Sequence, residues 1–153
     1  YDFSEVSLDG ARRESSRMGL SNTKFELRDV ATLSGPSRYD LITAFDSIHD
    51  QAQPRRVLKG IFEALRSDGT FLCVDIAGSS NLHENFGNPM AALMYAISTM
   101  HCMTVSLALG GEGLGTMWGE QKAHELFAEA GFTRIETKQI ESHFENNYYV
   151  CQK

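Results

Sequence analysis

The sequence predicts an α/β fold with a mostly parallel sheet and an antiparallel final strand. Two apolar runs, residues 39–45 and 70–76, are typical of strands that are covered on both faces. A helical pattern of apolar residues separates them, and helices that alternate with apolar strands indicate a parallel sheet. Two last strands, at 134–141 and 148–152, are joined by residues 142–147. This link is too short for a crossover helix, so the last strand must run antiparallel.

The amino-terminal part predicts a strand end, a helix and a second strand. Residues 1–3 read as the end of a strand, and Ser4 is a good N-cap for a helix that stops at Gly19. Polar and apolar residues alternate over 24–28, which predicts a strand. A glycine, a proline and a serine at 35–37 predict a loop after it.

The carboxy-terminal part predicts two more helices around an insertion. One helix begins at Pro54, and a turn at 67–69 follows it. The other helix runs from about Glu120 to Ala130 and ends at Gly131. Nothing in residues 1–153 marks a second domain, so we expect a single partial domain with an insertion at 78–119.

The insertion contains an apolar segment, Met90–Leu109, and a glycine cluster at 110–115. No basic cluster flanks the segment, so we expect a buried helix or a lid over a pocket rather than a membrane span. The glycine cluster resembles a dinucleotide-binding fingerprint by spacing alone. It follows no strand and opens no βαβ unit, so we expect a flexible loop or hinge.

The composition and charge of the chain disfavour several classes of partner. The net charge is −6, which disfavours a nucleic-acid partner. The chain opens without a signal peptide, and its three cysteines form no CxxC pair. We therefore expect buried free thiols, a cytoplasmic location, no membrane partner and no metal site.

Acidic residues stand at the carboxyl ends of the expected strands, where open α/β sheets bind their ligands. These residues are Asp2, Asp29, Asp46 and Asp75. Aspartate is also a common turn residue, so each has a purely structural alternative. Their joint placement predicts a ligand site at this rim.

Four segments in order resemble class I S-adenosylmethionine-dependent methyltransferases. They are the amino-terminal stretch from Tyr1-Asp2-Phe3-Ser4 through its helix and Gly19-Leu20-Ser21-Asn22 to Asp29-Val30, the run 39–50, the run 64–71, and the antiparallel last pair of strands. The resemblance covers nearly the whole chain and implies a Rossmann-like methyltransferase sheet that is truncated at its amino-terminal end. Residues 98–103 further resemble a bacterial group in which a winged-helix segment precedes this domain.

No glycine-rich cofactor loop and no first strand precede Asp2. We therefore expect this piece alone to bind the cofactor weakly or not at all. An exposed sheet edge would also allow it to pair with another copy as a homo-oligomer.

The resemblance gives the strand-end residues roles toward S-adenosylmethionine. Asp2 would accept hydrogen bonds from both ribose hydroxyls, with Phe3 against the adenine edge or in the core. Asp29 would accept from the adenine amino group, and the backbone of Val30 would meet the ring. The methionine part would lie against Phe45 and Asp46.

His49, in the loop after residues 39–45, is the candidate catalytic residue. A histidine titrates near neutrality and could take a proton from an acceptor hydroxyl or amine. Its alternatives are packing beside the cofactor and capping of the helix that begins at Pro54.

The insertion would supply the wall of the acceptor pocket. Its candidates are Tyr95, His101, Met103 and Trp118, although large apolar residues at helical spacing are more often core.

The predicted function is S-adenosylmethionine-dependent methyl transfer to a small-molecule acceptor. One alternative is a ligand-sensing or regulatory module that keeps the fold without catalysis. Another is a nicotinamide-dependent oxidoreductase, in which Asp2 would hold the ribose of a nicotinamide cofactor. The antiparallel final strand pair and the acid after the third strand argue against this last option.

Overall fold

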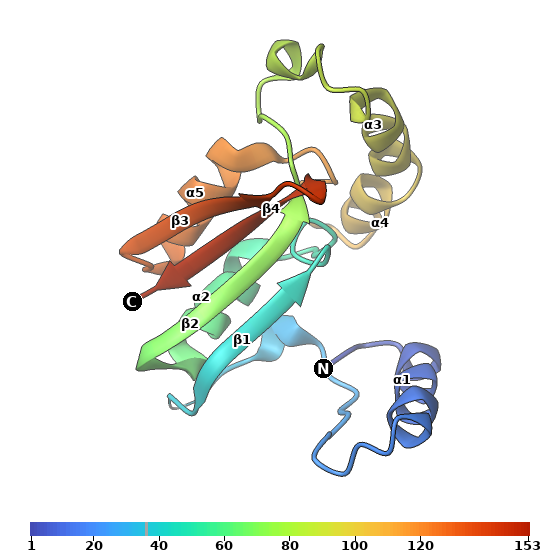
Figure 1. The fold of residues 1–153 in the computed structure, drawn as a ribbon, viewed down its shortest axis with the longest axis vertical. Helices are drawn as coiled ribbons and strands as arrows, with labels where there is room; N and C mark the ends of the chain where they lie inside the picture. The colour runs from blue at the N-terminus through green and yellow to red at the C-terminus, as the bar shows by residue number, and fades with distance from the viewer. Residues whose placement is uncertain (36) are drawn as a thin grey trace.

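The computed structural model describes residues 1–35 and 37–153. The loop predicted at 35–37 includes Pro36, which lies outside the described residues. The main body is a four-stranded sheet with strand order β1-β2-β4-β3 (Figure 1). The strands are β1 Tyr39–Phe45, β2 Leu65–Ile76, β3 Arg134–Ile140 and β4 His143–Gln152.

The strand directions confirm the predicted sheet. β1 pairs with β2 in parallel, and β4 pairs antiparallel with both β2 and β3. It follows that β1, β2 and β3 run the same way and that the final strand alone opposes them. The carboxyl ends of β1 and β2 therefore meet at one rim.

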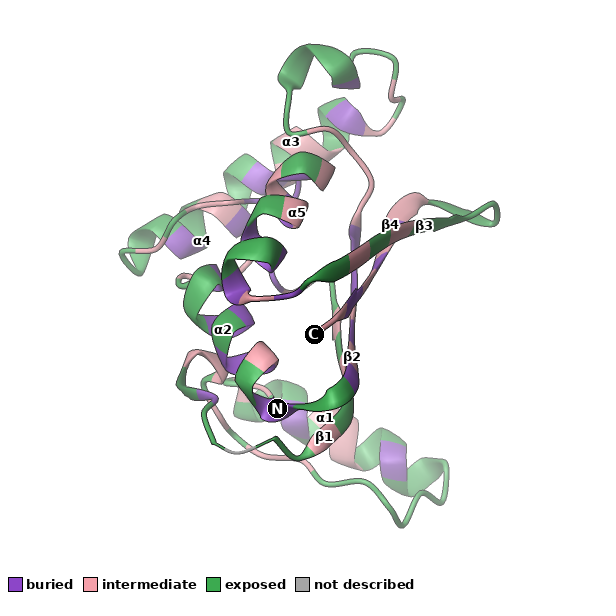
Figure 2. Cartoon of the chain, turned by 90° about the vertical axis from the view of Figure 1, so that its left-hand side faces the viewer, coloured by how far each residue is buried: buried purple, intermediate pink, exposed green. Residues whose placement is uncertain are grey.

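Two helices cover one face of this sheet, as Figure 2 shows. They are α2 Pro54–Ala64 and α5 Gly119–Ala130, both close to their predicted bounds. Gly131 ends α5 with a φ of 117°, a left-handed conformation that suits glycine. The covered face carries Phe71 and Cys73 of β2, which are fully buried and pack with Phe127 of α5.

Residues 1–32, which we call the amino-terminal unit, lie beside β1 (Figure 1). Its helix α1 spans Glu5–Arg17, and the Ser4 side chain accepts from the Ser7 amide, as the N-cap prediction required. The strand predicted at 24–28 is wrong as a regular strand: one parallel bridge joins Asp2 to Leu27. The ladder ends here because Ser4 caps α1 and turns the partner segment into the helix.

Two other boundaries differ from the prediction. The expected turn at 67–69 lies inside β2, where the register slips between the pairs Tyr39–Leu65 and Leu41–Thr70. The expected link at 142–147 lies mostly inside β4, which begins at His143 and pairs there with Ile140. In both cases pairing with a neighbouring strand extends the strand beyond its apolar run.

The insertion lies beyond the carboxyl ends of β1 and β2 (Figure 1). It contains a short 3₁₀ helix η2 Leu82–Asn85, then α3 Ala91–Met100 and α4 Cys102–Ala108. The expectation of a buried helix is wrong, since only 22% of the stretch Ala91–Ala108 is buried. By length and composition alone this stretch could cross a membrane, a property that core helices of soluble proteins also show.

Candidate active site

The loop after β1 turns sharply at Asp46. The Asp46 amide donates to the Val74 carbonyl at 2.9 Å, which prolongs the β1–β2 ladder by one step. Asp46 then has a φ of 43°, and it is the one non-glycine residue with positive φ within 1–35 and 37–153. Aspartate tolerates this left-handed conformation better than most residues, at a cost of about 1–2 kcal/mol. The turn sends the chain inward, so that Ile48 and His49 are buried.

His49 forms a buried pair with Asp75 at the end of β2. Its Nδ1 lies 2.7 Å from Oδ1 of Asp75, and the two residues are 2% and 0% exposed. The same carboxylate oxygen accepts from the Ile76 amide at 2.9 Å. Since a carboxylate accepts, we assign the imidazole proton to Nδ1, which leaves the lone pair on Nε2.

The charges around His49 set its basicity. Burial by itself would lower its pKa, but the hydrogen bond and charge of Asp75 and the charges of Asp50 and Asp46 raise the pKa above its ordinary value. The pKa of Asp46 is raised too, first by burial and then by the charge of Asp75. The site therefore holds a histidine of increased basicity inside a group of carboxylates.

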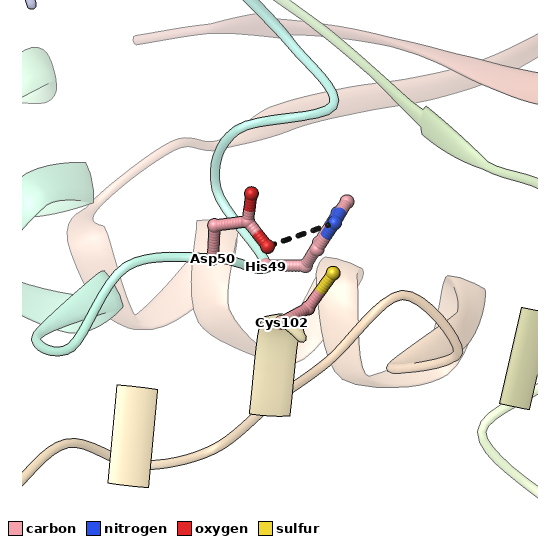
Figure 3. Close-up of side chains that lie close together, drawn as sticks. All are labelled: His49, Asp50 and Cys102. Atoms are coloured by element: carbon pink, nitrogen blue, oxygen red, sulfur yellow. Dashed lines mark ion pairs between the residues drawn. The ribbon is translucent and has the colours of Figure 1, made fainter. Parts of the chain in front are cut away.

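Asp50 and Cys102 lie on the Nε2 side of His49 (Figure 3). Oδ1 of Asp50 is 3.3 Å from Nε2. Cys102, the first residue of α4, lies on the same side of the imidazole. Their donor atoms lie within 4.8 Å of one another, a grouping that could hold a metal ion. A metal would need the thiolate, however, and burial together with Asp50 raises the pKa of Cys102 to about 11. Without a metal ion, Cys102 is therefore a neutral thiol at neutral pH and suits hydrogen bonding.

Two buried carboxylate oxygens in this group have no hydrogen-bond partner among the described residues. They are Oδ1 of Asp50 and Oδ2 of Asp75. Buried polar atoms are usually paired, and exceptions often mark functional sites. The group thus keeps unused acceptor capacity beside the imidazole.

Three of the predicted site residues come together at this rim: Phe45, Asp46 and His49. Phe45 is 60% exposed, so it is available to a ligand. His49 does not cap α2, because the N-cap of that helix is Gln53, which makes no side-chain cap hydrogen bond.

The residues predicted to hold adenosine lie on the amino-terminal unit. The bridge between Asp2 and Leu27 sets two parallel segments side by side, and Asp29 follows two residues later. Oδ1 of Asp2 accepts from the Ser4 amide, and Oδ1 of Asp29 accepts from the Ala31 amide, each at 2.8 Å. Phe3 is 75% exposed rather than core, and Val30 opens the short 3₁₀ helix η1 Val30–Thr32.

The predicted acceptor-wall residues are spread over the insertion. The hydroxyl of Tyr95 accepts from Nδ2 of Asn85 at 3.0 Å, beside a hollow of about 260 Å³. This hollow is lined by Leu82, Asn85, Phe86, Asn88, Ala91, Ala92 and Tyr95. His101 is exposed and Met103 half-buried, on either side of Cys102. Trp118 is buried in the core cluster, with its ring 6.1 Å from that of Phe127.

Sequence reasoning missed three members of the group around His49. Asp75 was placed at a strand end but was not paired with His49, and neither Asp50 nor Cys102 was assigned a role. The signal available for Asp75 is the alternation Phe71, Cys73, Asp75, which puts a carboxylate on the buried face of β2.

Comparison with known proteins gives a family match. The family model described as "Methyltransferase domain" matches residues 1–131. Among curated proteins, no match was found.

Several solved structures share the fold. A candidate O-methyltransferase of Nostoc punctiforme PCC 73102 has a TM-score of 0.72 at 20% identity, over 95% of this chain and 42% of that one. PigF, solved with SAH, has a TM-score of 0.69 at 19% identity, over 97% and 41%. Human N-acetylserotonin methyltransferase, solved with SAM, has a TM-score of 0.62 at 17% identity, over 92% and 37%. The chain thus spans about two-fifths of their lengths, and the likeness shows the fold alone.

Proposed function

The chain belongs to the family of methyltransferase domains, and from that premise we propose that it forms part of an enzyme that transfers a methyl group from S-adenosylmethionine to a small-molecule acceptor. The observation that carries the proposal is the buried pair of His49 and Asp75, with Nδ1 and Oδ1 2.7 Å apart. We propose His49 as the general base and Asp75 as the residue that orients it.

The pair suits removal of a proton from an acceptor hydroxyl or amine. Asp75 holds Nδ1, so the lone pair of Nε2 is directed away from Asp75 and toward the side of the ring where Asp50 and Cys102 lie. A pKa raised above its ordinary value makes His49 a stronger base. When bound, the cofactor supplies a methyl group on a positively charged sulfur, whose bond to the methyl carbon breaks as the acceptor atom bonds that carbon. The acceptor proton moves to Nε2 of His49.

Six residues are proposed to hold the cofactor. Asp2 and Asp29 each use Oδ1 in a local backbone hydrogen bond, and Oδ2 of each accepts no hydrogen bond from the described residues. Those oxygens fit the donors of ribose and adenine. Phe3 and Val30 would contact the adenine, and Phe45 and Asp46 would contact the methionine part. Their support is the parallel bridge at Asp2 and the position of Asp46 at the end of β1.

The insertion at 78–119 is proposed as a lid that selects the acceptor. Cys102 of α4 already lies beside His49 and Asp50, so this segment reaches the proposed base. Tyr95, His101, Met103 and Trp118 are proposed as its contacts with the acceptor.

The remaining expectations concern partners and location. We propose a cytoplasmic protein without nucleic-acid or membrane partners. Pairing of two copies is also proposed, and its support is that β1 stands at the edge of the described sheet.

The test is methyl transfer from S-adenosylmethionine to a panel of small hydroxyl and amine compounds by an enzyme that contains this chain, because we expect the chain alone to bind the cofactor weakly or not at all. We expect His49→Gln to lower kcat by about 10²–10⁴-fold, the usual contribution of a general base, while cofactor affinity changes little. His143→Gln is the matched control, because His143 is exposed at the start of β4. Cofactor binding without any turnover would instead support the sensor alternative. Equal activity of both variants would refute the base role.

A further inference from the structure

The carbonyl groups of the loop that carries His49 accept hydrogen bonds from the insertion. The carbonyl of His49 accepts from the Gly115 amide at 3.3 Å. That of Gln51 accepts from Oγ of Ser106 at 3.1 Å, and that of Ala52 accepts from the Glu112 amide at 3.0 Å. Three donors from one segment therefore fix the backbone on which the proposed base stands.

Ser106 of α4 is at the centre of this contact. It is fully buried, and its hydroxyl donates to Gln51 and accepts from the Gly113 amide at 3.1 Å. Its own carbonyl accepts from the Gly111 amide at 2.8 Å. One side chain thus joins α4, the glycine cluster at 110–115 and the loop of His49.

The glycines allow these segments to approach closely. A Cβ on Gly111 would lie 2.5 Å from Cα of Ala52 and 2.6 Å from Oγ of Ser106. Such distances are well inside van der Waals contact, so only glycine fits. The glycine cluster, predicted to be a flexible loop or hinge, is hydrogen-bonded to Ser106 and to the loop of His49.

We infer that Ser106 is a positioning residue for His49, an inference that rests on the proposed function of the site. The hydroxyl satisfies a carbonyl and an amide that would otherwise be unpaired in a buried place. Without it the loop of His49 loses its link to α4, and the imidazole no longer keeps one position between Asp75 and Cys102. The insertion then sets the geometry of the base in addition to any contact with the acceptor.

The experiment compares Ser106→Ala with Thr116→Ala. Thr116 is a stringent control, because it follows Gly115 and is also buried, but its hydroxyl donates to the Met94 carbonyl at 2.8 Å rather than to the loop of His49. The readout is the ¹⁵N spectrum of the His49 imidazole, recorded where the ring is neutral. We expect a single Nδ1–H tautomer in the original chain and in Thr116→Ala. We expect averaged nitrogen shifts in Ser106→Ala.

The second readout is kinetic. Misplacement of a catalytic group by about 1 Å can cost about 10²-fold, so we expect Ser106→Ala to lower kcat by that order with little change in KM. An unchanged imidazole spectrum in Ser106→Ala, or the same change in Thr116→Ala, would overturn the inference. Absence of methyl transfer by an enzyme that contains this chain would count against the proposed function, while the spectrum still tests the positioning of His49.

Folding of each variant is checked by circular dichroism. If Ser106→Ala does not fold, Ser106→Cys takes its place, since a thiol fills the volume but is a weak donor. The same averaging of the imidazole shifts is expected from it, and a single tautomer there would contradict the inference.

Discussion

Nδ1 of His49 lies 2.7 Å from Oδ1 of Asp75, and both side chains are almost completely buried. The two residues are 26 positions apart: Asp75 stands near the end of β2, and His49 lies in the loop that follows the parallel strand β1. The parallel register, in which Phe45 is opposite Val74, brings Asp46 level with Asp75 and lets the next turn deliver His49 to the carboxylate.

Replacement of Asp75 by asparagine should lower the basicity of His49. The hydrogen bond and charge of Asp75 are the largest influences that raise the pKa of His49, so Asp75→Asn should lower that pKa. The amide can also present its NH₂ group to the ring and favour the wrong tautomer. We expect kcat to fall by about 10²–10⁴-fold, as for loss of a general base. NMR titration of the imidazole measures the pKa directly, and Asp40→Asn on the exposed start of β1 is the control.

The stability of the fold should depend on the protonation of His49. Its pKa in the folded chain is above the ordinary value of 6.5, so the charged form favours folding. This contribution is fully present below pH 6.5 and is lost as the pH rises through the raised folded pKa.

Urea unfolding across this range measures the effect. The original chain should lose stability with rising pH relative to His49→Gln, which lacks the group. Parallel pH profiles of the two proteins would show that the pKa is not raised in the folded state.

Local signals in the sequence were sufficient for most helices. Ser4 caps α1 through the amide of Ser7, and Gly131 ends α5 in the left-handed conformation. Both are effects between residues a few positions apart, so they are readable from sequence. The apolar run of β1 likewise gave that strand its correct bounds.

Strand boundaries that depend on a distant partner could not be predicted in this way. β2 begins at Leu65 because that residue pairs with Tyr39, and β4 begins at His143 because it pairs with Ile140. Residues 24–28 alternate correctly, yet they pair at Leu27 only, since the partner segment turns into α1 at Ser4. The alternation of polar and apolar residues is a property of one segment, whereas the length of a strand depends on the segment and on its pairing partner.

The candidate site shows the same division. His49 could be singled out by residue type and by its place after an apolar strand. To identify its partner Asp75, one needs the register of the parallel strands β1 and β2. To identify Cys102, one needs the path of the insertion. Sequence alone therefore identified the proposed base but not the group that sets its protonation.

The cysteines should resist thiol reagents in the folded chain. All three are free and buried, as the sequence predicted. Burial is the first cause in each case: it raises the pKa of Cys102 to about 11 and that of Cys151 to about 12, and the pKa of Cys73 lies well above its ordinary 9.0. Because the thiolate is the reactive form, modification should be slow until denaturant exposes the thiols. A disulfide reagent with a chromophore measures this, and rapid reaction of Cys102 in native buffer would contradict it.

Asp2 should contribute to cofactor affinity through its carboxylate. A hydrogen bond to a charged group is worth about 1.5–3 kcal/mol, so Asp2→Asn should weaken binding of S-adenosylhomocysteine about 10–100-fold. Isothermal titration of an enzyme that contains this chain measures the affinity, because the chain alone is expected to bind weakly or not at all. Asp9→Asn on the exposed part of α1 is the control, since its carboxylate pairs with Arg12. Equal affinities of the two variants would remove Asp2 from the proposed cofactor site.

Two glycine substitutions should have opposite effects on stability. Gly119 begins α5 with a φ of 76°, and a Cβ there would lie 2.1 Å from the backbone nitrogen of Ser80. The left-handed conformation and the overpacking together should make Gly119→Ala destabilising by about 2–4 kcal/mol. Gly10 lies inside α1, and the nearest atom to its Cβ would be Nη2 of Arg13, at 4.0 Å. Gly10→Ala should therefore stabilise the chain by about 0.5–1 kcal/mol, because alanine loses less backbone entropy on folding.

Urea midpoints of the two alanine variants measure the difference. The Ser80 hydroxyl donates to the Trp118 carbonyl at 2.7 Å and accepts from the Lys122 amide at 2.9 Å. A shift of Ser80 would therefore also break the hydrogen bonds that join the first turn of α5 to the start of the insertion. Gly119→Ala should accordingly lose protection from hydrogen exchange at the Lys122 amide before the sheet unfolds. A Gly119→Ala midpoint equal to that of Gly10→Ala would mean that residues 79 and 80 can move aside, and that the junction between the insertion and α5 is not fixed by this close approach.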